Sequence, residues 1–164
     1  MTLGERIAIL NDGALMQFAT PLHIYRRPAN LFVATFIGSP PINTIDGEVS
    51  SEGSRSEFSG DGFSVSIPGC DYSGECTLAV RPESLSMDRN AENAFRCSVQ
   101  RLEPLGNELL VHLSGPGDRS WVARVDPESS CAVGDAVNVF VDSTRIHLFA
   151  GANKERIPTR ADDG

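Results

Sequence analysis

The prolines between Thr20 and Asn43 confine this chain to two short helices near its N-terminus. Thr20 followed by Pro21 predicts a helix start, because a threonine hydroxyl caps free amides and proline fits the first helical position. Pro28 disfavours the helical conformation for the residue before it, so this helix is expected to end near Arg26. Beyond this segment the apolar residues show no long helical periodicity, so we expect no long helix in the rest of the chain.

A second short helix is predicted over residues 29–37. Its apolar residues fall at helical spacing on one broad face, which comprises Leu31, Phe32, Phe36 and Ile37. Gly38 suits the left-handed residue that follows a helix, and Pro40-Pro41 forbids a continuation. We expect this face to pack against the structure that follows.

The first twenty residues predict a β-hairpin. Residues 6–10 and 14–18 are short apolar runs that flank Asn11-Asp12-Gly13, a typical hairpin turn. Two strands alone are marginally stable in water, so this hairpin needs another surface. It is expected to pair with a second copy, to fold onto the later β structure, or to be disordered.

From residue 42 onward, short alternating segments separated by turns predict a mainly β fold. Turn signals include Gly53-Ser54, Gly60-Asp61-Gly62 and Gly115-Pro116-Gly117, and the polar residues 88–92 are expected to form a loop. The strand candidates are 47–50, 55–58, 63–67, 75–80, 95–105, 109–113, 121–125, 137–141 and 146–149. Such a set favours a β-barrel or sandwich of the oligomer-binding (OB) type. The charged residues from 152 onward are expected to be disordered.

Composition excludes several function classes. The formal net charge is −8, which disfavours binding to phosphate backbones, so we expect no nucleic-acid partner. No apolar run approaches the roughly 18 residues that a membrane-spanning helix requires, and no secretion signal is recognisable.

The residues that carry chemistry in other proteins form no catalytic or metal-binding pattern here. The four cysteines (Cys70, Cys76, Cys97 and Cys131) include no C-x-x-C pair, and the chain has three histidines. We expect four reduced thiols, with a Cys70–Cys76 disulfide as the alternative. The chain contains no phosphate-binding loop, no paired acid and base carboxylates and no nucleophile motif, so we expect no enzymatic activity.

Several stretches, taken together and in order, resemble one family. They are 1–8 (MTLGERIA), 11–13 (NDG), 20–25 (TPLHIY), 36–43 (FIGSPPIN), 81–83 (RPE), 103–108 (EPLGNE) and 145–149 (RIHLF). Together they resemble the C-terminal part of the ATP-binding subunits of sugar-type ABC importers, the maltose, multiple-sugar and glycerol-3-phosphate class.

The resemblance implies a domain organisation. Residues 1–41 correspond to the end of the nucleotide-binding domain, with its last hairpin and two helices. Residues 42–151 correspond to a transport-associated OB (TOBE) regulatory domain, and residues 152–164 to a disordered tail. Met1 is then an internal methionine, and ATP and Mg²⁺ are expected only in the full-length parent, with no cofactor in this chain.

The resemblance also implies partners and a location. We expect this chain to form a homodimer, and the full-length parent to have permease subunits of an importer and a regulatory protein as partners. The expected location is the cytoplasm, at the inner face of the membrane.

Three groups of residues are candidates for a working site. Arg81, Pro82 and Glu83 end a predicted strand, where a guanidinium lies beside a carboxylate. This pair is expected to bond across a subunit interface, to meet a polar ligand, or to form an internal pair that pins a loop. Gly106 and Asn107 form either a plain turn or a surface for a neighbouring subunit. Phe32, Phe36 and Ile37 belong either to the core against the β domain or to a subunit interface. Trp121 is expected in the core.

Two functions follow. The first is the regulatory and dimerisation domain of an importer ATPase subunit for sugars or related solutes, itself without the ATP site. The alternative is a stand-alone OB-type module that binds a small ligand, either an oxyanion or a sugar.

Overall fold

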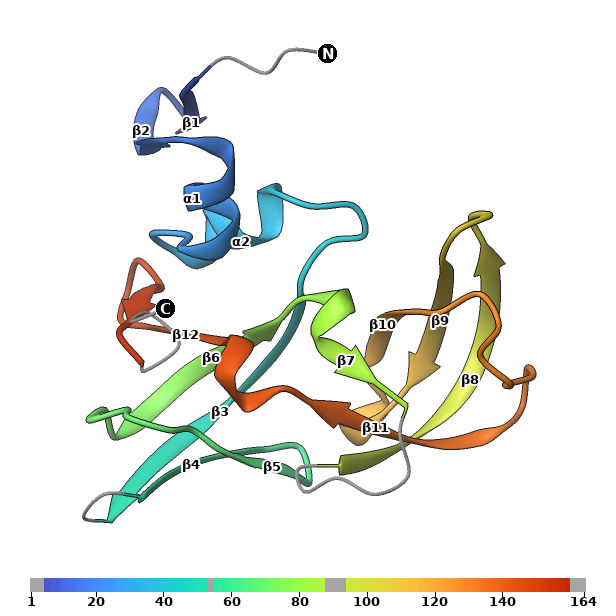
Figure 1. Ribbon diagram of the computed structural model, residues 1–164. Helices are drawn as coiled ribbons and strands as arrows, with labels where there is room; N and C mark the ends of the chain where they lie inside the picture. The colour runs from blue at the N-terminus through green and yellow to red at the C-terminus, as the bar shows by residue number, and fades with distance from the viewer. Residues whose placement is uncertain (1–4, 53–54, 88–93, 160–164) are drawn as a thin grey trace.

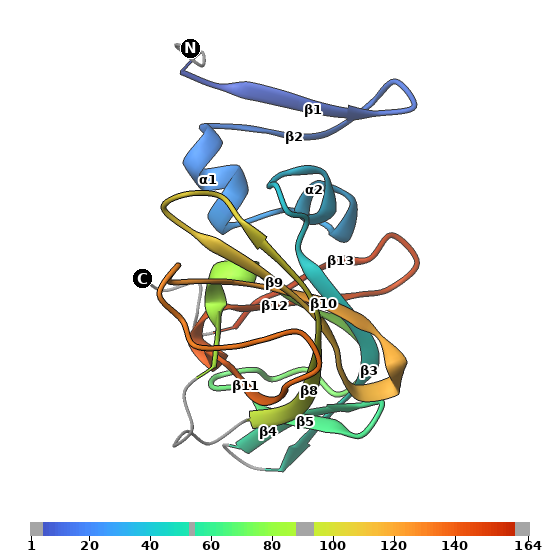
Figure 2. The ribbon, with the colours of Figure 1, turned by 90° about the vertical axis from the view of Figure 1, so that its right-hand side faces the viewer.

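The computed structural model describes residues 5–52, 55–87 and 94–159, and it places a hairpin and two helices on one end of a β structure (Figure 1). The hairpin lies farthest from the β structure, and the helices lie between the two (Figure 2). Within these ranges, neither helix has the length and apolar character needed to cross a bilayer.

The predicted hairpin is confirmed. Strands β1 (Ile7–Asn11) and β2 (Ala14–Ala19) pair antiparallel around the Asp12-Gly13 turn, where both residues have positive φ. The hairpin packs on the helices through a cluster centred on Ile9, Ile24 and Val33. The hairpin is ordered and packs on the helices, not on the β domain, so two of the expected fates are wrong and pairing with a second copy stays a prediction.

The helices are α1 (Pro21–Arg26) and α2 (Leu31–Phe36). The Thr20 hydroxyl caps α1 as predicted, by accepting from the amide of His23 at 3.3 Å. Helix α2 is shorter than predicted because the Asn30 side chain caps it, by accepting from the amide of Val33 at 3.0 Å.

The β domain consists of two antiparallel sheets. One has the strand order β13-β12-β6-β3-β4-β5, and the other has the order β10-β9-β8-β11-β7. Their bounds are β3 (Asn43–Glu52), β4 (Arg55–Gly60), β5 (Phe63–Ser66), β6 (Gly74–Val80), β7 (Leu85–Ser86), β8 (Ala94–Pro104), β9 (Leu109–Ser114), β10 (Ser120–Val125), β11 (Ala136–Val141), β12 (Ile146–Ala150) and β13 (Glu155–Ile157). Short 3₁₀ turns are η1 (Pro82–Ser84), η2 (Pro116–Asp118) and η3 (Ser143–Arg145). The prediction of a mainly β fold is confirmed.

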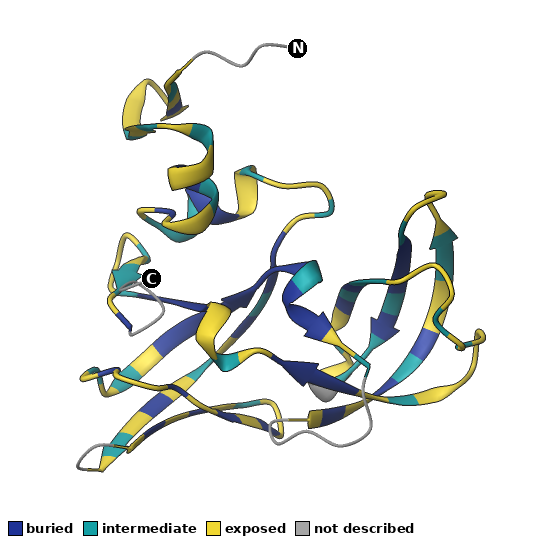
Figure 3. Cartoon of the chain, viewed as in Figure 1, coloured by how far each residue is buried: buried dark blue, intermediate teal, exposed yellow. Residues whose placement is uncertain are grey.

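The core lies between the two sheets, as the dark blue strands show (Figure 3). Phe58, Phe63, Phe95 and Trp121 form its aromatic centre, and the Phe95 ring lies 4.8 Å from both the Phe63 and Trp121 rings. The predicted core position of Trp121 is therefore confirmed.

Strand β6 is buried on both faces. Leu78 and Val80 face the core between the sheets, whereas Ala79 packs with Phe149, Ile42 and Ala34 of α2. This second cluster joins the helices to the β domain by apolar contact.

Asn43 connects the two sheets. It lies on β3, and its side-chain oxygen accepts from the amide of Val122 on β10 at 2.7 Å. Its amide nitrogen donates to the carbonyls of Val122 at 2.9 Å and Val80 at 3.3 Å. The buried side chain therefore has both of its polar atoms bonded, which makes it a specific link between the sheets.

The prediction of a disordered tail is wrong for its first residues. Glu155–Ile157 form β13, which pairs with β12, and the amide of Leu31 donates to the carbonyl of Lys154 at 3.0 Å. Residues 160–164, the predicted turn at Gly53-Ser54 and the predicted loop at 88–92 lie outside the described residues. All four cysteines are free, so the Cys70–Cys76 disulfide is absent.

Candidate functional site

Arg81 lies where β6 ends, at the boundary between the β domain and the helices. The paired ladder runs through Val80, and Pro82 begins the 3₁₀ turn η1. Proline has no amide hydrogen to donate to a ladder, so the strand ends here as predicted. Arg81 is nevertheless buried, with 4% of its surface exposed. A buried guanidinium requires internal acceptors.

The acceptors are main-chain carbonyls near the ends of both helices. One terminal nitrogen of Arg81 donates to the carbonyl of Ala34 at 3.1 Å and to that of Ile37, and the other donates to the carbonyl of Tyr25 at 3.1 Å. The last carbonyls of a helix have no partner within the helix and carry partial negative charge. The Arg81 guanidinium therefore fixes both helices to the end of β6.

Tyr25 completes this contact. Its ring lies under the Arg81 guanidinium, with 4.1 Å from the guanidinium carbon to the ring centre, which is a cation–π geometry. Its hydroxyl donates to a carboxylate oxygen of Glu83. Burial, followed by this hydrogen bond and the negative charge of Glu83, raises the pKa of Tyr25 to about 12.

The prediction of an internal Arg81–Glu83 ion pair is wrong. Within the described residues no ion pair joins the two side chains, and each meets Tyr25 instead. We call Arg81, Glu83 and Tyr25 the joint cluster. Sequence reasoning missed Tyr25, because its partners lie 56 and 58 positions away and no local pattern marks such a contact.

Gly106 and Asn107 lie in the turn between β8 and β9, apart from the joint cluster. The amide of Leu105 donates to the carbonyl of Glu108 at 2.8 Å, and Gly106 has a φ of +89°. Glu108 pairs with Arg124 at 3.4 Å, and Arg124 donates to the carbonyl of Ser39 at 2.7 Å. This turn is thereby linked to the segment that follows α2, while its role toward a neighbour stays a prediction.

The predicted apolar face of α2 is correct for Leu31, which packs with Ala79 and Phe149 of the β domain, and wrong for the other three residues. Its buried residues are Val33 and Ala34, whereas Phe36 is 64% exposed. Phe32 and Ile37 pack with the hairpin and α1, not against the β domain. Phe32 and Phe36 stack with ring centres 5.9 Å apart, so they present an aromatic surface whose interface role stays a prediction.

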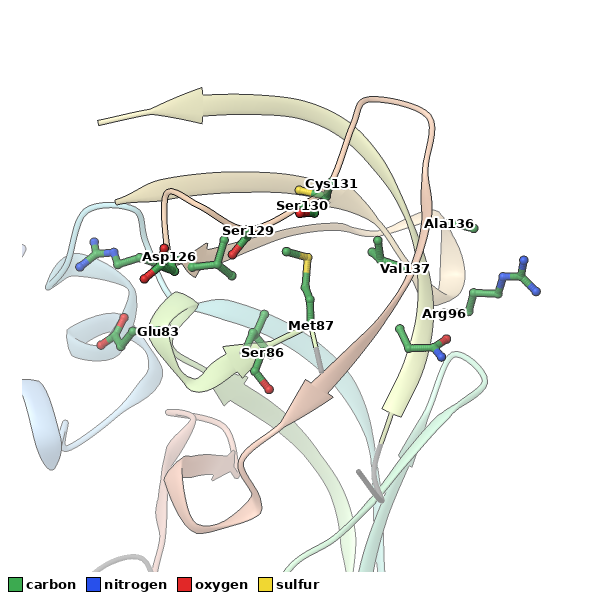
Figure 4. A pocket seen from close by; sticks show the side chains of 14 residues that line it. Glu83, Ser86, Met87, Arg96, Asp126, Ser129, Ser130, Cys131, Ala136 and Val137 are labelled. Carbon is green, nitrogen blue, oxygen red and sulfur yellow. The ribbon is translucent and has the colours of Figure 1, made fainter. Parts of the chain in front are cut away.

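A groove of about 1120 Å³ opens beside β7 and β11, under the loop that follows β10 (Figure 4). Its polar lining includes Arg96, Asp126, Ser129, Ser130 and Asn138, and Glu83 lies at its edge toward the helices. Sequence reasoning named none of the first five, because they come from separate strands and a loop. In the described residues of the chain no three metal-ligating side chains gather.

The β domain belongs to a known type. Residues 78–149 match the family model of the TOBE domain. The chain carries a TOBE domain. The match runs from β6 to β12, so it includes Arg81, Glu83, the β8–β9 turn and the groove.

Similarity to transport proteins extends over nearly the whole chain. It is 38% identical to the xylose/arabinose import ATP-binding protein XacK of Haloferax volcanii, over 98% of this chain and 43% of that protein. It is 37% identical to the sn-glycerol-3-phosphate import ATP-binding protein UgpC of Salmonella typhimurium, over 96% of this chain and 44% of that protein. The matched region is the C-terminal part of these proteins, which confirms the resemblance. The chain spans less than half the length of the curated relatives it matches.

A solved structure supports the OB-type fold. The cytoplasmic molybdate-binding protein ModG superposes with a TM-score of 0.54 at 17% identity, over 65% of this chain and 94% of ModG. At this identity the likeness concerns the fold alone, and it confirms the OB-type prediction.

Proposed function

We propose that this chain is the regulatory and dimerisation module of an ABC importer ATPase subunit for sugars or related solutes. The observation that carries the proposal is the identity of 37–38% to two import ATP-binding proteins across nearly the whole chain. The module does not itself bind or hydrolyse ATP, because its sequence contains no phosphate-binding loop. It acts in the cytoplasm, beside the permease subunits.

The hairpin supports an attachment to an ATPase domain. Leu10, Leu15 and Phe18 are each more than half exposed on the two short strands of the hairpin. Exposed apolar groups gathered on one small element are typical of an interaction surface. In our proposal, these exposed side chains of the hairpin pack against a β-sheet of an ATPase domain.

The β domains of two subunits hold the dimer while the ATPase domains open and close. A regulator that prefers one state of the dimer shifts transport by its difference in affinity for the two states. The joint cluster would carry such a change, because it bonds the β domain to both helices.

Light scattering on the purified chain tests dimerisation through the β domain. The expected result is a dimer at concentrations of tens of micromolar. Leu105 lies beside the Gly106-Asn107 turn and is 49% exposed, so Leu105→Ser should weaken the dimer at least about tenfold. Leu15→Ser is the matched control, since Leu15 is 60% exposed on the hairpin.

Three results would contradict this proposal. A strict monomer at high concentration removes the dimerisation claim. A dimer broken by Leu15→Ser and untouched by Leu105→Ser places the contact on the hairpin instead. ATP turnover by the purified chain, above that of a buffer blank, removes the claim that the module does not itself hydrolyse ATP.

The groove beside β7 favours a second candidate function, a module that binds a small oxyanion or sugar. Its lining is mainly polar, and Arg96 supplies a positive charge, whereas the charge of Arg124 is paired with Glu108. Calorimetry with molybdate and with maltose separates the candidates: saturable heat from either supports the second, and its absence from both rejects it.

A further inference from the structure

A second pocket lies at the joint between the helices and the β domain, and Glu83 lines both this pocket and the groove. Its volume is about 440 Å³, within the range of small-molecule sites. Helix α1 and its C-terminal end supply Tyr25, Arg26 and Arg27. The end of β6 with η1 supplies Arg81, Glu83 and Ser84, and η3 supplies Arg145. Three segments distant in sequence thus meet around one space.

The charge of this pocket is opposite to that of the chain. Four arginines and one carboxylate line it, in a protein whose formal net charge is −8. Arg26, Arg27 and Arg145 are exposed, and Arg145 has Asp142 as an ion-pair partner at 3.3 Å. Guanidinium groups match the geometry of phosphate oxygens and bind them with two parallel hydrogen bonds. The pocket therefore favours a phosphate group.

Two buried polar atoms at the pocket call for further partners. The Nε of Arg81 and one carboxylate oxygen of Glu83 have no hydrogen-bond partner within the described residues. The first is a donor and the second an acceptor, and both residues line the pocket. A buried polar atom without a partner is costly, so such a pair points to a ligand that both accepts and donates. A hydroxyl group does both.

We propose that this pocket binds the phosphate monoester of a small polyol. The phosphate meets Arg26, Arg27 and Arg145, and a hydroxyl of the polyol bonds to Glu83 and to the Nε of Arg81. The Glu83 carboxylate would repel a bare phosphate placed against it, so its position selects an ester that carries a hydroxyl.

This ligand class specifies what would regulate the importer subunit. The regulatory effect of binding rests on the proposed function, whereas binding itself does not. An ester held by α1 and by η3 together stabilises the arrangement of helices and β domain that the joint cluster holds. Binding itself is measured on this chain alone, whether or not the chain dimerises.

Calorimetry with sn-glycerol 3-phosphate tests the site, with methyl phosphate as the probe that keeps the charge and lacks a hydroxyl. We expect saturable binding of glycerol 3-phosphate and at least about tenfold weaker binding of methyl phosphate. Arg145→Gln should weaken glycerol 3-phosphate binding at least about tenfold. Arg101→Gln is the matched control, because Arg101 and Arg145 are 62% and 65% exposed and each has one carboxylate partner.

Other results would overturn the proposal. Equal affinity for the two esters means that Glu83 and Arg81 contribute no hydroxyl recognition. Equal losses in Arg145→Gln and Arg101→Gln mean that overall charge, and not this pocket, attracts the anion. Absence of binding to the folded chain removes the site outright, and leaves the light-scattering test of dimerisation unaffected. Conversion of a dimer to a monomer by Arg145→Gln, with no ester bound by either form, makes the pocket a contact between subunits.

Discussion

The guanidinium of Arg81 donates a hydrogen bond to the main-chain carbonyl of Ala34 at 3.1 Å, across 47 positions of sequence. Arg81 ends a central strand of the β domain, and Ala34 lies in the last turn of α2. The same side chain also reaches the carbonyls of Ile37 and Tyr25. One residue of the TOBE domain therefore satisfies main-chain acceptors near the ends of both helices.

Replacing Arg81 should destabilise the chain strongly. Arg81→Ala leaves three carbonyls without their donor and removes the cation–π contact with Tyr25, so we expect a loss of about 3 kcal/mol in the free energy of unfolding. Urea denaturation followed by the fluorescence of Trp121 measures it. Arg101→Ala, at an exposed position, should cost less than about 0.5 kcal/mol. Equal costs for the two variants would show that the buried contacts of Arg81 contribute nothing.

The Tyr25–Glu83 hydrogen bond should make stability fall at alkaline pH. The pKa of Tyr25 is about 12 in the folded chain against an ordinary value of 10.0, so folding favours its protonated form. This contribution is complete below pH 10 and is lost as the pH rises toward 12. Burial also raises the pKa of Cys76 to about 11 and of Cys97 to about 12, so the thiols add to the same decline.

Tyr25→Phe separates the tyrosine from the thiols. We expect this variant to be less stable than the wild type by about 1 kcal/mol at neutral pH, because Glu83 loses its donor. The two stability curves should converge between pH 10 and 12, where the wild type loses the same bond. Curves that run parallel through this range would contradict the assigned pKa of Tyr25.

Local signals in the sequence predict most of the elements. The Asp12-Gly13 turn, the Thr20-Pro21 start of α1 and the alternation along the strands depend on neighbouring residues, and the structure contains all of them. Strand β13 was missed because it is only three residues long and two of them, Glu155 and Arg156, are charged. The buried face of α2 was misassigned because its apolar residues surround the helix, and the position of β6 decides which of them are covered.

The candidate site was only partly predicted. Arg81 and Glu83 were recognisable as a charged pair after a strand, whereas their common partner Tyr25 depends on how α1 docks. The basic pocket could not be predicted for the same reason, because Arg26 and Arg145 come together only after the sheet and the helices have packed. Contacts between distant segments have no periodic signature in one sequence.

Cys131 should be the most reactive thiol. The other three cysteines are buried, whereas Cys131 is partly exposed in the loop that borders the groove. Burial, and then the negative charge of Asp135, raises its pKa, so its reaction should be faster at pH 9 than at pH 7. Labelling with a disulfide reagent should show one fast thiol, which Cys131→Ser removes. A fast phase that survives this substitution would contradict the observed burial.

Asn43 should be required for the connection between the sheets. Asn43→Ala leaves the amide and the carbonyl of Val122 without their partner, so we expect a loss of about 2 kcal/mol in the free energy of unfolding. Asn138→Ala, at a strand position that borders the open groove, is the control and should cost less than about 0.5 kcal/mol. Urea denaturation compares the two, and an Asn43→Ala variant as stable as the control would contradict the inferred link.

Hydrogen exchange followed by mass spectrometry tests most directly whether the joint cluster unites the helices and the β domain in a single cooperative unit. Peptides that cover residues 21–37 and residues 76–82 should show the same free energy of opening in the wild type. In Arg81→Ala the peptide over residues 21–37 should exchange faster than the peptide over residues 76–82. Helices that already exchange far faster than β6 in the wild type would contradict the claim that Arg81 holds them to the TOBE domain.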